Sequence, residues 1–402
     1  MKIGLLKETK SPVDNRVALS PKQVAQLNST YKDSQIVVQS SDIRAFSDDE
    51  YRKEGIEVVD NVNDCDILFG IKEVKISNLI PNKHYFFFGH IAKMQSYNRP
   101  LLQAILKNNL TFSDYEYLVD DKNRRLCAFG WWAGIVGVYY TLRGYGLKTK
   151  EFELLKPDLK FTLDILKAEL KKTNLPALKI LITGNGRVSQ GAQYILNEIG
   201  AEILDESQYL SSSKVNKLSY FVADSDILVK EKQGKPFVEA DFFANPQNYE
   251  SDFYRFAIHA DILLSCHFWS SKAPVYLTED IMRDEKLHIK IVGDITCDIC
   301  GSIKSTVRSS THADPYYDYN PLTEKEEPAF SSDKNITVMA VDTCPNALAI
   351  DASCFFGEML TKHVFIPLLE GRYTDVINRA TIVKDGELTQ AFQYLESFAK
   401  GE

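Results

Sequence analysis

The chain has 402 residues, more than a typical single domain, so we expect two domains. Its 44% apolar and 25% charged residues are typical of a globular protein that can bury a sizeable core. The net charge of −8 argues against nucleic acid as the main partner and provides no attraction to an anionic membrane.

The N-terminal residues and the cysteines both indicate a cytoplasmic protein. Lys2, Lys7 and Glu8 interrupt the first apolar run, which argues against a signal peptide, and no stretch is apolar for long enough to span a bilayer. Seven scattered cysteines, an odd number, suit a reducing compartment better than a disulfide framework. Cys297 and Cys300 form a single C-x-x-C pair. We expect a packed turn there and no metal, because a closed zinc site needs four ligands.

The first third of the chain alternates short apolar runs with helical patterns. Residues 3–6 predict a strand, and Ser20-Pro21 predicts a helix start with an N-cap and a first-turn proline. Helical spacing recurs at residues 101–107. Further strand candidates are short and rich in β-branched or aromatic residues: 36–38, 56–59, 66–70, 85–88 and 111–117. This alternation predicts a parallel sheet covered by helices.

A second alternating unit begins after the charged, helix-like residues 158–172. Strands are predicted at residues 178–183, 201–204, 226–229, 261–265 and 289–294, with a helix over 188–199. Residues 316–335 are polar and predict a surface loop. A strand at 335–341 and an amphipathic helix at 351–363 follow, and we expect both to return to the first domain.

A glycine-rich turn, residues 184–191 (GNGRVSQG), lies between a predicted strand and a predicted helix, as a dinucleotide-binding fingerprint requires. Gly184 permits the tight turn, Gly186 lets the backbone approach a pyrophosphate, and the helix N-terminus attracts the phosphates. Ser189 replaces the usual third glycine, and we expect Gly191 to provide the close packing of helix on strand.

Asp205 lies 21 positions beyond Gly184, at the end of the next predicted strand. A carboxylate there suits the two ribose hydroxyls of the adenosine half and repels a 2′-phosphate, which favours NAD, with NADP as the alternative. Asp298 follows the last strand of the unit and is expected beside the nicotinamide, although such carboxylates also arise as helix caps. The expected cofactor contacts are Gly184, Gly186, Arg187, Val188, Asp205 and Asp298.

These patterns predict an α/β protein with two Rossmann-like domains, parallel sheets and a cleft between the domains. The expected substrate domain comprises residues 1–134 and 317–402. The expected dinucleotide-binding domain comprises residues 135–316.

Several segments resemble the superfamily of alanine dehydrogenase, saccharopine dehydrogenase and transhydrogenase. Residues 16–21 (RVALSP) resemble its arginine motif, 70–73 (GIKE) its lysine motif and 88–90 (FGH) its histidine motif. Residues 124–130 (RRLCAFG) with 132–134 (WAG) resemble the lysine-forming saccharopine dehydrogenases and the lysine–ketoglutarate reductase half of bifunctional animal enzymes. Residues 184–193, 293–302 and 351–360 also resemble the lysine–ketoglutarate reductase half. The resemblance therefore spans nearly the whole chain. Residues 341–345 (VDTCP) depart from the usual pattern of Asp, His or Asn, then Leu-Pro.

The resemblance implies the interconversion of saccharopine, NAD and water with lysine, 2-oxoglutarate and NADH. That reaction removes a hydride from a carbon bearing a secondary amine and then hydrolyses the resulting imine, and both steps move protons. The resemblance places Lys72 near the reacting amine and His90 near the carbinolamine. A desolvated lysine beside other cations loses its proton near neutral pH, and histidine titrates there.

Read without the resemblance, each residue is ordinary. A lysine after a strand is most often a solvated surface charge, and His90 at the end of an apolar run is more often a satisfied core histidine. His84 is predicted to lie at the surface, and His259 and His267 have no motif around them.

The resemblance implies that Arg16 holds a substrate carboxylate, because a guanidinium matches a carboxylate with two parallel hydrogen bonds. Saccharopine has three carboxylates and alanine has one, so the additional cations Lys93, Arg124 and Arg125 favour the larger substrate. The alternative for the adjacent arginines is a surface loop pair.

Glu116 and Asp342 are expected to adjust the charge of Lys72 and of the substrate amine. The expected partner is a small amino-acid substrate, and the sequence carries no signal for an oligomeric state. Two alternatives remain: an alanine dehydrogenase or other small amino-acid dehydrogenase on this scaffold, and a non-catalytic NAD-binding regulator. The first has no need of the additional cations, and the second has no need of Lys72 and His90.

Overall fold

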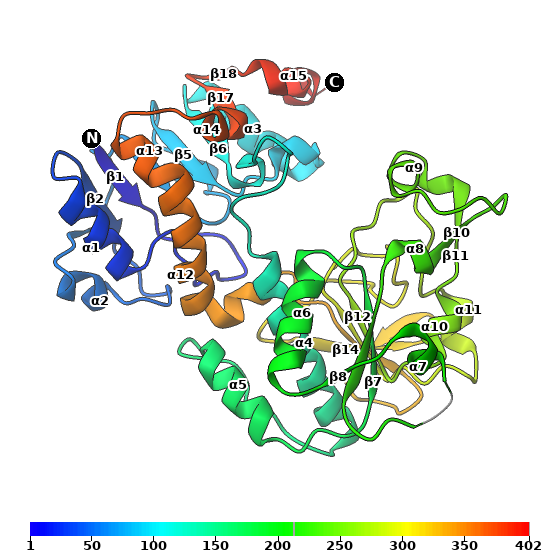
Figure 1. The fold of residues 1–402 in the computed structure, drawn as a ribbon. Helices are drawn as coiled ribbons and strands as arrows, with labels where there is room; N and C mark the ends of the chain where they lie inside the picture. The colour runs from blue at the N-terminus through cyan, green and yellow to red at the C-terminus, as the bar shows by residue number, and fades with distance from the viewer. Residues whose placement is uncertain (212–213, 402) are drawn as a thin grey trace. The chain divides into compact units, whose positions relative to one another are not determined.

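The computed structural model describes residues 1–211 and 214–401, which form two compact units (Figure 1). The first unit is Met1–Phe129 with Leu348–Glu402, and the second unit is Gly130–Ala347. The second unit thus continues past residue 316, where we expected it to end. No described helix is long and apolar enough to cross a membrane.

The first unit is built on an eight-stranded sheet in the order β18-β17-β6-β5-β4-β1-β2-β3. In this order the six neighbouring strands β6, β5, β4, β1, β2 and β3 are parallel. β17 and β18 add an antiparallel edge beside β6. Their bounds are β1 (Lys2–Leu5), β2 (Gln35–Gln39), β3 (Val58–Val59), β4 (Ile67–Phe69), β5 (His84–Phe87), β6 (Thr111–Asp114), β17 (Thr381–Lys384) and β18 (Glu387–Leu388). Because parallel strands end at one edge of a sheet, the residues that follow β1, β4, β5 and β6 gather there.

Three helices of the first unit, α1, α3 and α12, lie where the sequence predicted helices. α1 begins at Pro21 with Ser20 as its N-cap, as expected, and the Gln23 side chain accepts a hydrogen bond from Ser20 N at 2.8 Å. α12 brings the C-terminal segment beside α1, where Gln23 Nε2 donates to Cys354 O. The helix bounds are α1 (Pro21–Thr30), α2 (Asp48–Lys53), α3 (Arg99–Lys107), α12 (Ala349–Leu360), α13 (Ile366–Leu369), α14 (Asp375–Ala380) and α15 (Leu395–Lys400), with a π-helical turn at Thr361–Phe365.

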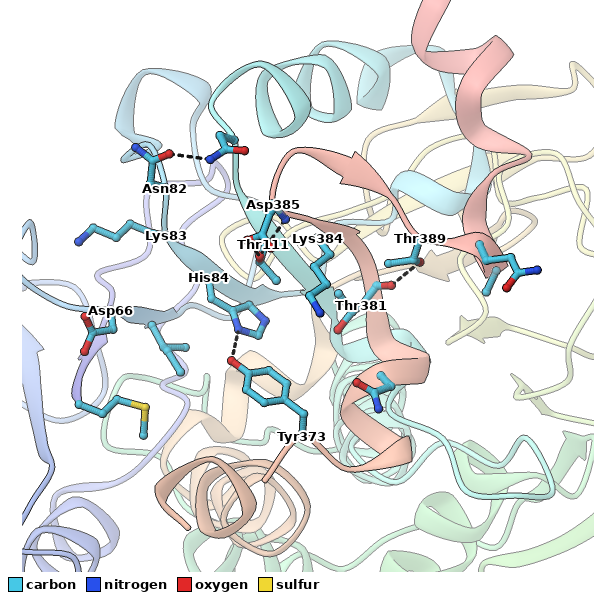
Figure 2. A pocket seen from close by; sticks show the side chains of 16 residues that line it. Asp66, Asn82, Lys83, His84, Thr111, Tyr373, Thr381, Lys384, Asp385 and Thr389 are labelled. Carbon is cyan, nitrogen blue, oxygen red and sulfur yellow. Dashed lines mark hydrogen bonds between the residues drawn. The ribbon is translucent and has the colours of Figure 1, made fainter. Parts of the chain in front are cut away.

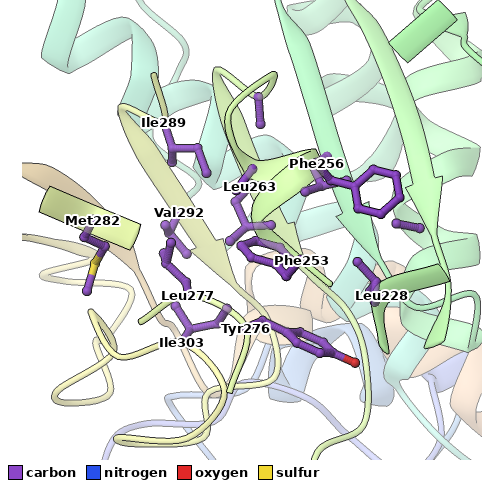
Figure 3. Close-up of a cluster of buried hydrophobic side chains, with 14 of the residues drawn as sticks. Leu228, Phe253, Phe256, Leu263, Tyr276, Leu277, Met282, Ile289, Val292 and Ile303 are labelled. Atoms are coloured by element: carbon purple, nitrogen blue, oxygen red, sulfur yellow. The ribbon is translucent and has the colours of Figure 1, made fainter. Parts of the chain in front are cut away.

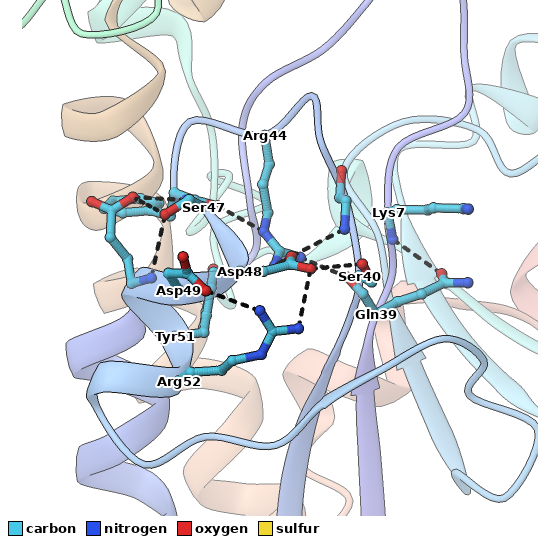
Figure 4. A network of polar contacts seen from close by, with 12 residues as sticks. Lys7, Gln39, Ser40, Arg44, Ser47, Asp48, Asp49, Tyr51 and Arg52 are labelled. Carbon is cyan, nitrogen blue, oxygen red and sulfur yellow. Dashed lines mark hydrogen bonds and ion pairs between the residues drawn. The ribbon is translucent and has the colours of Figure 1, made fainter.

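A polar network supports the loop that carries the arginine motif (Figure 4). The buried Arg44 donates to the backbone oxygens of Gln39 and Phe46, pairs with Asp48 and lies over the Tyr51 ring. Tyr51 in turn donates to Leu19 O at 2.7 Å. The end of β2 and the start of α2 are thereby tied to the segment that follows Arg16.

The second unit contains another eight-stranded sheet, in the order β15-β14-β16-β13-β12-β7-β9-β8. In this order the six neighbouring strands β16, β13, β12, β7, β9 and β8 are parallel. β14 and β15 form an antiparallel edge beside β16. Their bounds are β7 (Lys179–Thr183), β8 (Glu202–Ile203), β9 (Ser219–Ala223), β12 (Ile262–Ser265), β13 (Ile291–Asp294), β14 (Tyr316–Asn320), β15 (Lys325–Glu327) and β16 (Ile336–Met339), with a separate ribbon of β10 (Val229–Glu231) and β11 (Tyr249–Ser251).

Three expectations for this unit are wrong. Residues 316–335 contain β14 and β15 rather than only a surface loop, because the polar stretch buries tyrosines such as Tyr317. β16 pairs with β13 and β14, and so does not return to the first unit. The predicted strand at 226–229 is mostly helix α8 (Ser225–Leu228), and the strand lies just before it, at β9.

The remaining helices of the second unit cover its sheet, and α4, the longest, buries most of its residues. One buried cluster includes Leu263 and Val292 from the sheet with Phe253 and Tyr276 from the connections (Figure 3). The helix bounds are α4 (Gly130–Thr149), α5 (Leu163–Lys172), α6 (Arg187–Glu198), α7 (Glu206–Leu210), α8, α9 (Glu239–Ala244), α10 (Tyr254–Ala257) and α11 (Glu279–Arg283). Two α/β units with mostly parallel sheets confirm the predicted fold class.

Candidate active site

The lysine, histidine and arginine motifs meet at the carboxyl edge of the first sheet. Arg16 follows β1, Lys72 follows β4, His90 follows β5 and Glu116 follows β6. The sequence separates these residues, and the parallel strand order brings their loops together.

Arg16 is buried and held by Asp14. Its Nε donates to Asp14 Oδ1 at 2.9 Å and its Nη2 donates to Oδ2 at 2.5 Å, while the guanidinium lies 4.3 Å from the centre of the Phe129 ring. Burial acts to raise the pKa of Asp14, but Arg16 outweighs it and the pKa is lowered. Asp14 thus takes Nε and Nη2, the paired donors that we expected for a substrate carboxylate. Nη1 has no hydrogen-bond acceptor among the described residues.

Lys72 carries an ammonium group without a partner among residues 1–211 and 214–401, since its Nζ forms neither a hydrogen bond nor an ion pair with them. Burial lowers the pKa of Lys72, and the charge of Arg16 lowers it further, against a smaller opposing effect of Asp14. A lysine in such surroundings gives up its proton readily and can act as a general base.

Glu8 fixes the backbone that carries Lys72, a role that the sequence did not reveal. Its two carboxylate oxygens accept hydrogen bonds from Ile71 N at 2.6 Å and Lys72 N at 2.9 Å. Burial, with the nearby charge of Asp14, raises the pKa of Glu8 to about 8. Tyr115 OH also donates to the carbonyl oxygen of Gly70, so the lysine loop is anchored on both sides.

The backbone at His90 has φ +53° and is held by Asp114, a second residue that the sequence did not reveal. Asp114 Oδ2 accepts from Gly89 N and His90 N at 3.0 and 3.1 Å, and Oδ1 accepts from Glu116 N at 2.9 Å. Burial raises the pKa of Asp114 to about 6. One buried carboxyl therefore sets the position of both the histidine and the glutamate.

Glu116 is the centre of a cationic cluster. Its Oε2 lies 3.4 Å from His90 Nδ1, and its Oε1 lies 3.2 Å from Lys93 Nζ and 2.8 Å from Arg125 Nη2. Burial acts to raise the pKa of Glu116, but His90, Arg125 and Lys93 together lower it to about 2. The direct partners of Glu116 are therefore these three groups, and Lys72 is not one of them.

The adjacent arginines have different surroundings. Arg125 reaches Glu116 with its side chain half exposed, whereas the Arg124 side chain is 70% exposed and pairs with Asp120 at 2.7 Å. The structure thus separates Arg124 from the Glu116 cluster, in agreement with the surface alternative for this residue.

The glycine turn in the second unit has the backbone that a phosphate-binding turn needs. Gly184 has φ +79°, and a Cβ there would lie 2.8 Å from His267 Cα, so that no other residue fits well. Gly186 is the N-cap of α6, and a Cβ on it would meet nothing within 4 Å. Open space before a helix that begins with Arg187 and Val188 suits a pyrophosphate, because the first helical N–H groups lack intrahelical partners.

Gly191 lies where α6 packs against α4. Our expectation that Gly191 packs its helix against a strand is therefore wrong. A Cβ on Gly191 would collide with the carbonyl oxygen of Trp131, and a Cβ on Gly134 would collide with that of Val188. The two glycines let the helices approach until side chains have no room between them.

The three aspartates predicted in this unit all follow strands of its sheet. Asp205 is the N-cap of α7, where it accepts from Gln208 N and from Ser207 Oγ, each at 2.8 Å. Asp298 lies in the turn after β13, where its backbone oxygen accepts from Gly301 N at 2.9 Å. Asp342 is exposed and follows β16.

A cavity of about 990 Å³ lies at the amino edge of the first sheet, where β4, β5 and β6 begin (Figure 2). His84 lines it and is buried rather than at the surface as predicted. Its Nε2 lies 2.9 Å from Ser113 Oγ, and burial lowers its pKa to about 3. None of the described residues lining this cavity is a predicted site residue, so the candidate active site remains at the carboxyl edge.

Residues 4–136 match the family described as Alanine dehydrogenase/PNT, N-terminal domain. The match covers the arginine, lysine and histidine motifs and confirms the resemblance found in the sequence. No metal cluster of three or more His, Cys, Asp or Glu side chains is present in the part of the chain that the structure describes.

Relatives extend the similarity over the whole chain. An α-aminoadipic semialdehyde synthase of Arabidopsis thaliana is 30% identical over 99% of this chain and 41% of its own length. A saccharopine dehydrogenase [NAD(+), L-lysine-forming] of Candida glabrata is 27% identical, covering 90% of this chain and 89% of its own. The chain spans less than half the length of the α-aminoadipic semialdehyde synthases that it matches.

A solved structure of an L-alanine dehydrogenase shares the fold. Its TM-score is 0.66 at 17% identity, and the match covers 98% of this chain and 99% of that one. The similarity agrees with the two α/β units described above.

Proposed function

We propose that the protein is an NAD-dependent oxidoreductase that interconverts saccharopine, NAD and water with lysine, 2-oxoglutarate and NADH. The observation that carries the proposal is the partly buried Lys72 ammonium near Arg16, which has no hydrogen-bond or ion-pair partner among the described residues and lies on the same sheet edge as the cluster around Glu116. The lysine-forming relatives of similar length favour this reaction over other amino-acid oxidations.

Lys72 performs the first proton transfer. The secondary ammonium of saccharopine must lose a proton before the carbon beside it can release a hydride. NAD, when bound, would supply the hydride acceptor. Burial and the charge of Arg16 lower the pKa of Lys72, so that the neutral amine is available to take that proton.

His90 performs the proton transfers of hydrolysis. Water adds to the imine carbon as His90 takes its proton, and the resulting carbinolamine collapses when its nitrogen is protonated, which gives lysine and 2-oxoglutarate. Glu116 holds His90 at Nδ1, so that the other ring nitrogen, Nε2, is directed to the reacting groups.

Three cations serve the substrate carboxylates. Arg16 offers Nη1, while Lys93 and Arg125 share Glu116 and can each turn donors to a carboxylate that enters beside it. The turn at Gly184 and Gly186, with the start of α6, would hold the pyrophosphate of NAD.

The proposal is tested in the direction of saccharopine formation. The protein is incubated with NADH, lysine and 2-oxoglutarate, and the product is identified by mass spectrometry. We expect NADH consumption that requires both co-substrates and yields saccharopine. Consumption with pyruvate and ammonia in place of lysine and 2-oxoglutarate would instead support an alanine dehydrogenase.

A further inference from the structure

The strand order of the second unit changes which carboxylate can reach an adenosine ribose. β7, which leads into the glycine turn, pairs with β9 over five residues, from Lys179↔Ser219 to Thr183↔Ala223. β8, the next strand in the sequence after α6, pairs only with the far side of β9. In dinucleotide-binding units the ribose carboxylate stands at the carboxyl end of the strand beside the first one. Here that strand is β9.

Asp224 is the residue that directly follows β9. The residue before it, Ala223, accepts a hydrogen bond from Gly184 N through its carbonyl oxygen, at 2.7 Å. The backbone of the phosphate-binding turn is thus bonded to the residue that adjoins Asp224. Asp224 is exposed, and its Oδ1 accepts from Ser225 N at 2.7 Å. Its Oδ2 has no hydrogen-bond donor within residues 1–211 and 214–401 and can accept from a ligand.

Asp205 has a structural role that accounts for its presence. It ends the segment after β8, one strand further from the glycine turn, and its carboxylate caps α7 through Gln208 N and Ser207 Oγ. These hydrogen bonds lower the pKa of Asp205. The spacing of 21 residues from Gly184 indicates a ribose contact only when the next strand in the sequence is also the neighbouring strand in the sheet.

We propose that Asp224, and not Asp205, binds the adenosine ribose of the cofactor and selects NAD over NADP. The assignment rests on the proposed NAD-dependent function. The two vicinal ribose hydroxyls donate to the Asp224 carboxylate, whereas the 2′-phosphate of NADP would meet its negative charge and have no hydroxyl to donate from that position.

The test is a fluorescence titration of NADH and NADPH into the full chain, the variants Asp224→Ala and Asp224→Asn, and the matched control Asp205→Ala. We expect the unmodified protein to bind NADH more tightly than NADPH. Asp224→Ala should weaken NADH binding about 10–100-fold and reduce the discrimination against NADPH. Asp224→Asn keeps a side chain that can cap α8, so a folded variant is available even if the alanine variant unfolds, and it too should discriminate less.

Asp205→Ala should leave both affinities within about twofold and lower only the melting temperature, because it removes a helix cap. Loss of NADH binding in Asp205→Ala with full binding in both Asp224 variants would overturn the assignment while leaving the proposed function intact. If the unmodified protein binds neither NADH nor NADPH, both the assignment of Asp224 and the proposed function are overturned.

Discussion

Lys72 is partly buried, and its ammonium group meets no acceptor among the described residues, which is an unfavourable state for a charged group. The neutral amine relieves that cost and can remove a proton from the substrate. We expect Lys72→Met to lower kcat/KM for saccharopine about 10²–10⁴-fold while NADH binding stays near that of the unmodified protein. Steady-state kinetics and an NADH titration measure the two effects. The exposed Lys75, changed to Met, provides the matched control, and equal losses in both variants would remove Lys72 from the mechanism.

Glu8 makes stability depend on pH in a predictable direction. Its pKa is raised to about 8 in the folded protein from an ordinary value of 4.5, so the folded state keeps a proton that the unfolded state has lost. Stability present below pH 4.5 is therefore lost as the pH rises towards 8, by at most about 1.4 kcal/mol per unit. Urea unfolding at pH 5 and pH 8 should show a loss that is smaller in Glu8→Gln, by up to about 4 kcal/mol. Equal losses in the two proteins would show that Glu8 titrates normally.

Arg124 and Arg125 form a natural pair for comparison, since one joins Glu116 and the other pairs with Asp120. Arg125→Ala should weaken saccharopine binding about 10–100-fold, because a charge-assisted hydrogen bond contributes about 1.5–3 kcal/mol. Arg124→Ala should change it less than about twofold, as expected of an exposed ion pair. KM values for saccharopine test both expectations, and a larger effect at Arg124 would contradict the placement of the substrate at Glu116.

At the scale of elements, the contact of α4 with α6 depends on Gly134 and Gly191. Gly191→Ala should push α6 from α4, and the resulting overpacking costs about 1–3 kcal/mol, more than the gain in helix propensity of alanine. The control Gln190→Ala places the same alanine side chain at an exposed position of the same helix and should keep or raise the melting temperature, because alanine has the higher helix propensity. Thermal unfolding compares the melting temperatures of the two variants. A Gly191→Ala variant as stable as the control would show that the helices can separate without loss of stability.

The sequence predicted local features of these elements better than their neighbours in space. The start of α1 at Pro21 and the glycine turn after β7 depend on residues close in the chain, and both are confirmed. The insertion of β9 between β7 and β8 has no local signal, because strand pairing is decided by residues far apart in sequence. The prediction of Asp205 as the ribose contact assumed that β8 lies beside β7, and the sequence does not carry this strand order.

In the candidate site, too, the sequence predicted local motifs better than contacts between residues far apart in the chain. Motifs located Lys72 and His90, whereas Glu8, Asp14 and Asp114 were missed because they act on neighbouring side chains and on backbone N–H groups. An acidic residue after a strand looks the same in sequence whether it is solvated or accepts such hydrogen bonds.

At the scale of the molecule, two mostly parallel α/β units divide the proposed work. The first unit supplies the proton-transfer and carboxylate-binding groups, and the second supplies the dinucleotide-binding turn.

The most direct test of the central claim is the initial rate of NADH formation with saccharopine compared with alanine. We predict that saccharopine is oxidised to equal amounts of lysine and 2-oxoglutarate. We also predict that kcat/KM for alanine is at least about 100-fold lower, because alanine lacks the carboxylates that we propose for Lys93 and Arg125, the cations beside Glu116. Faster turnover of alanine than of saccharopine by the unmodified protein would contradict the account.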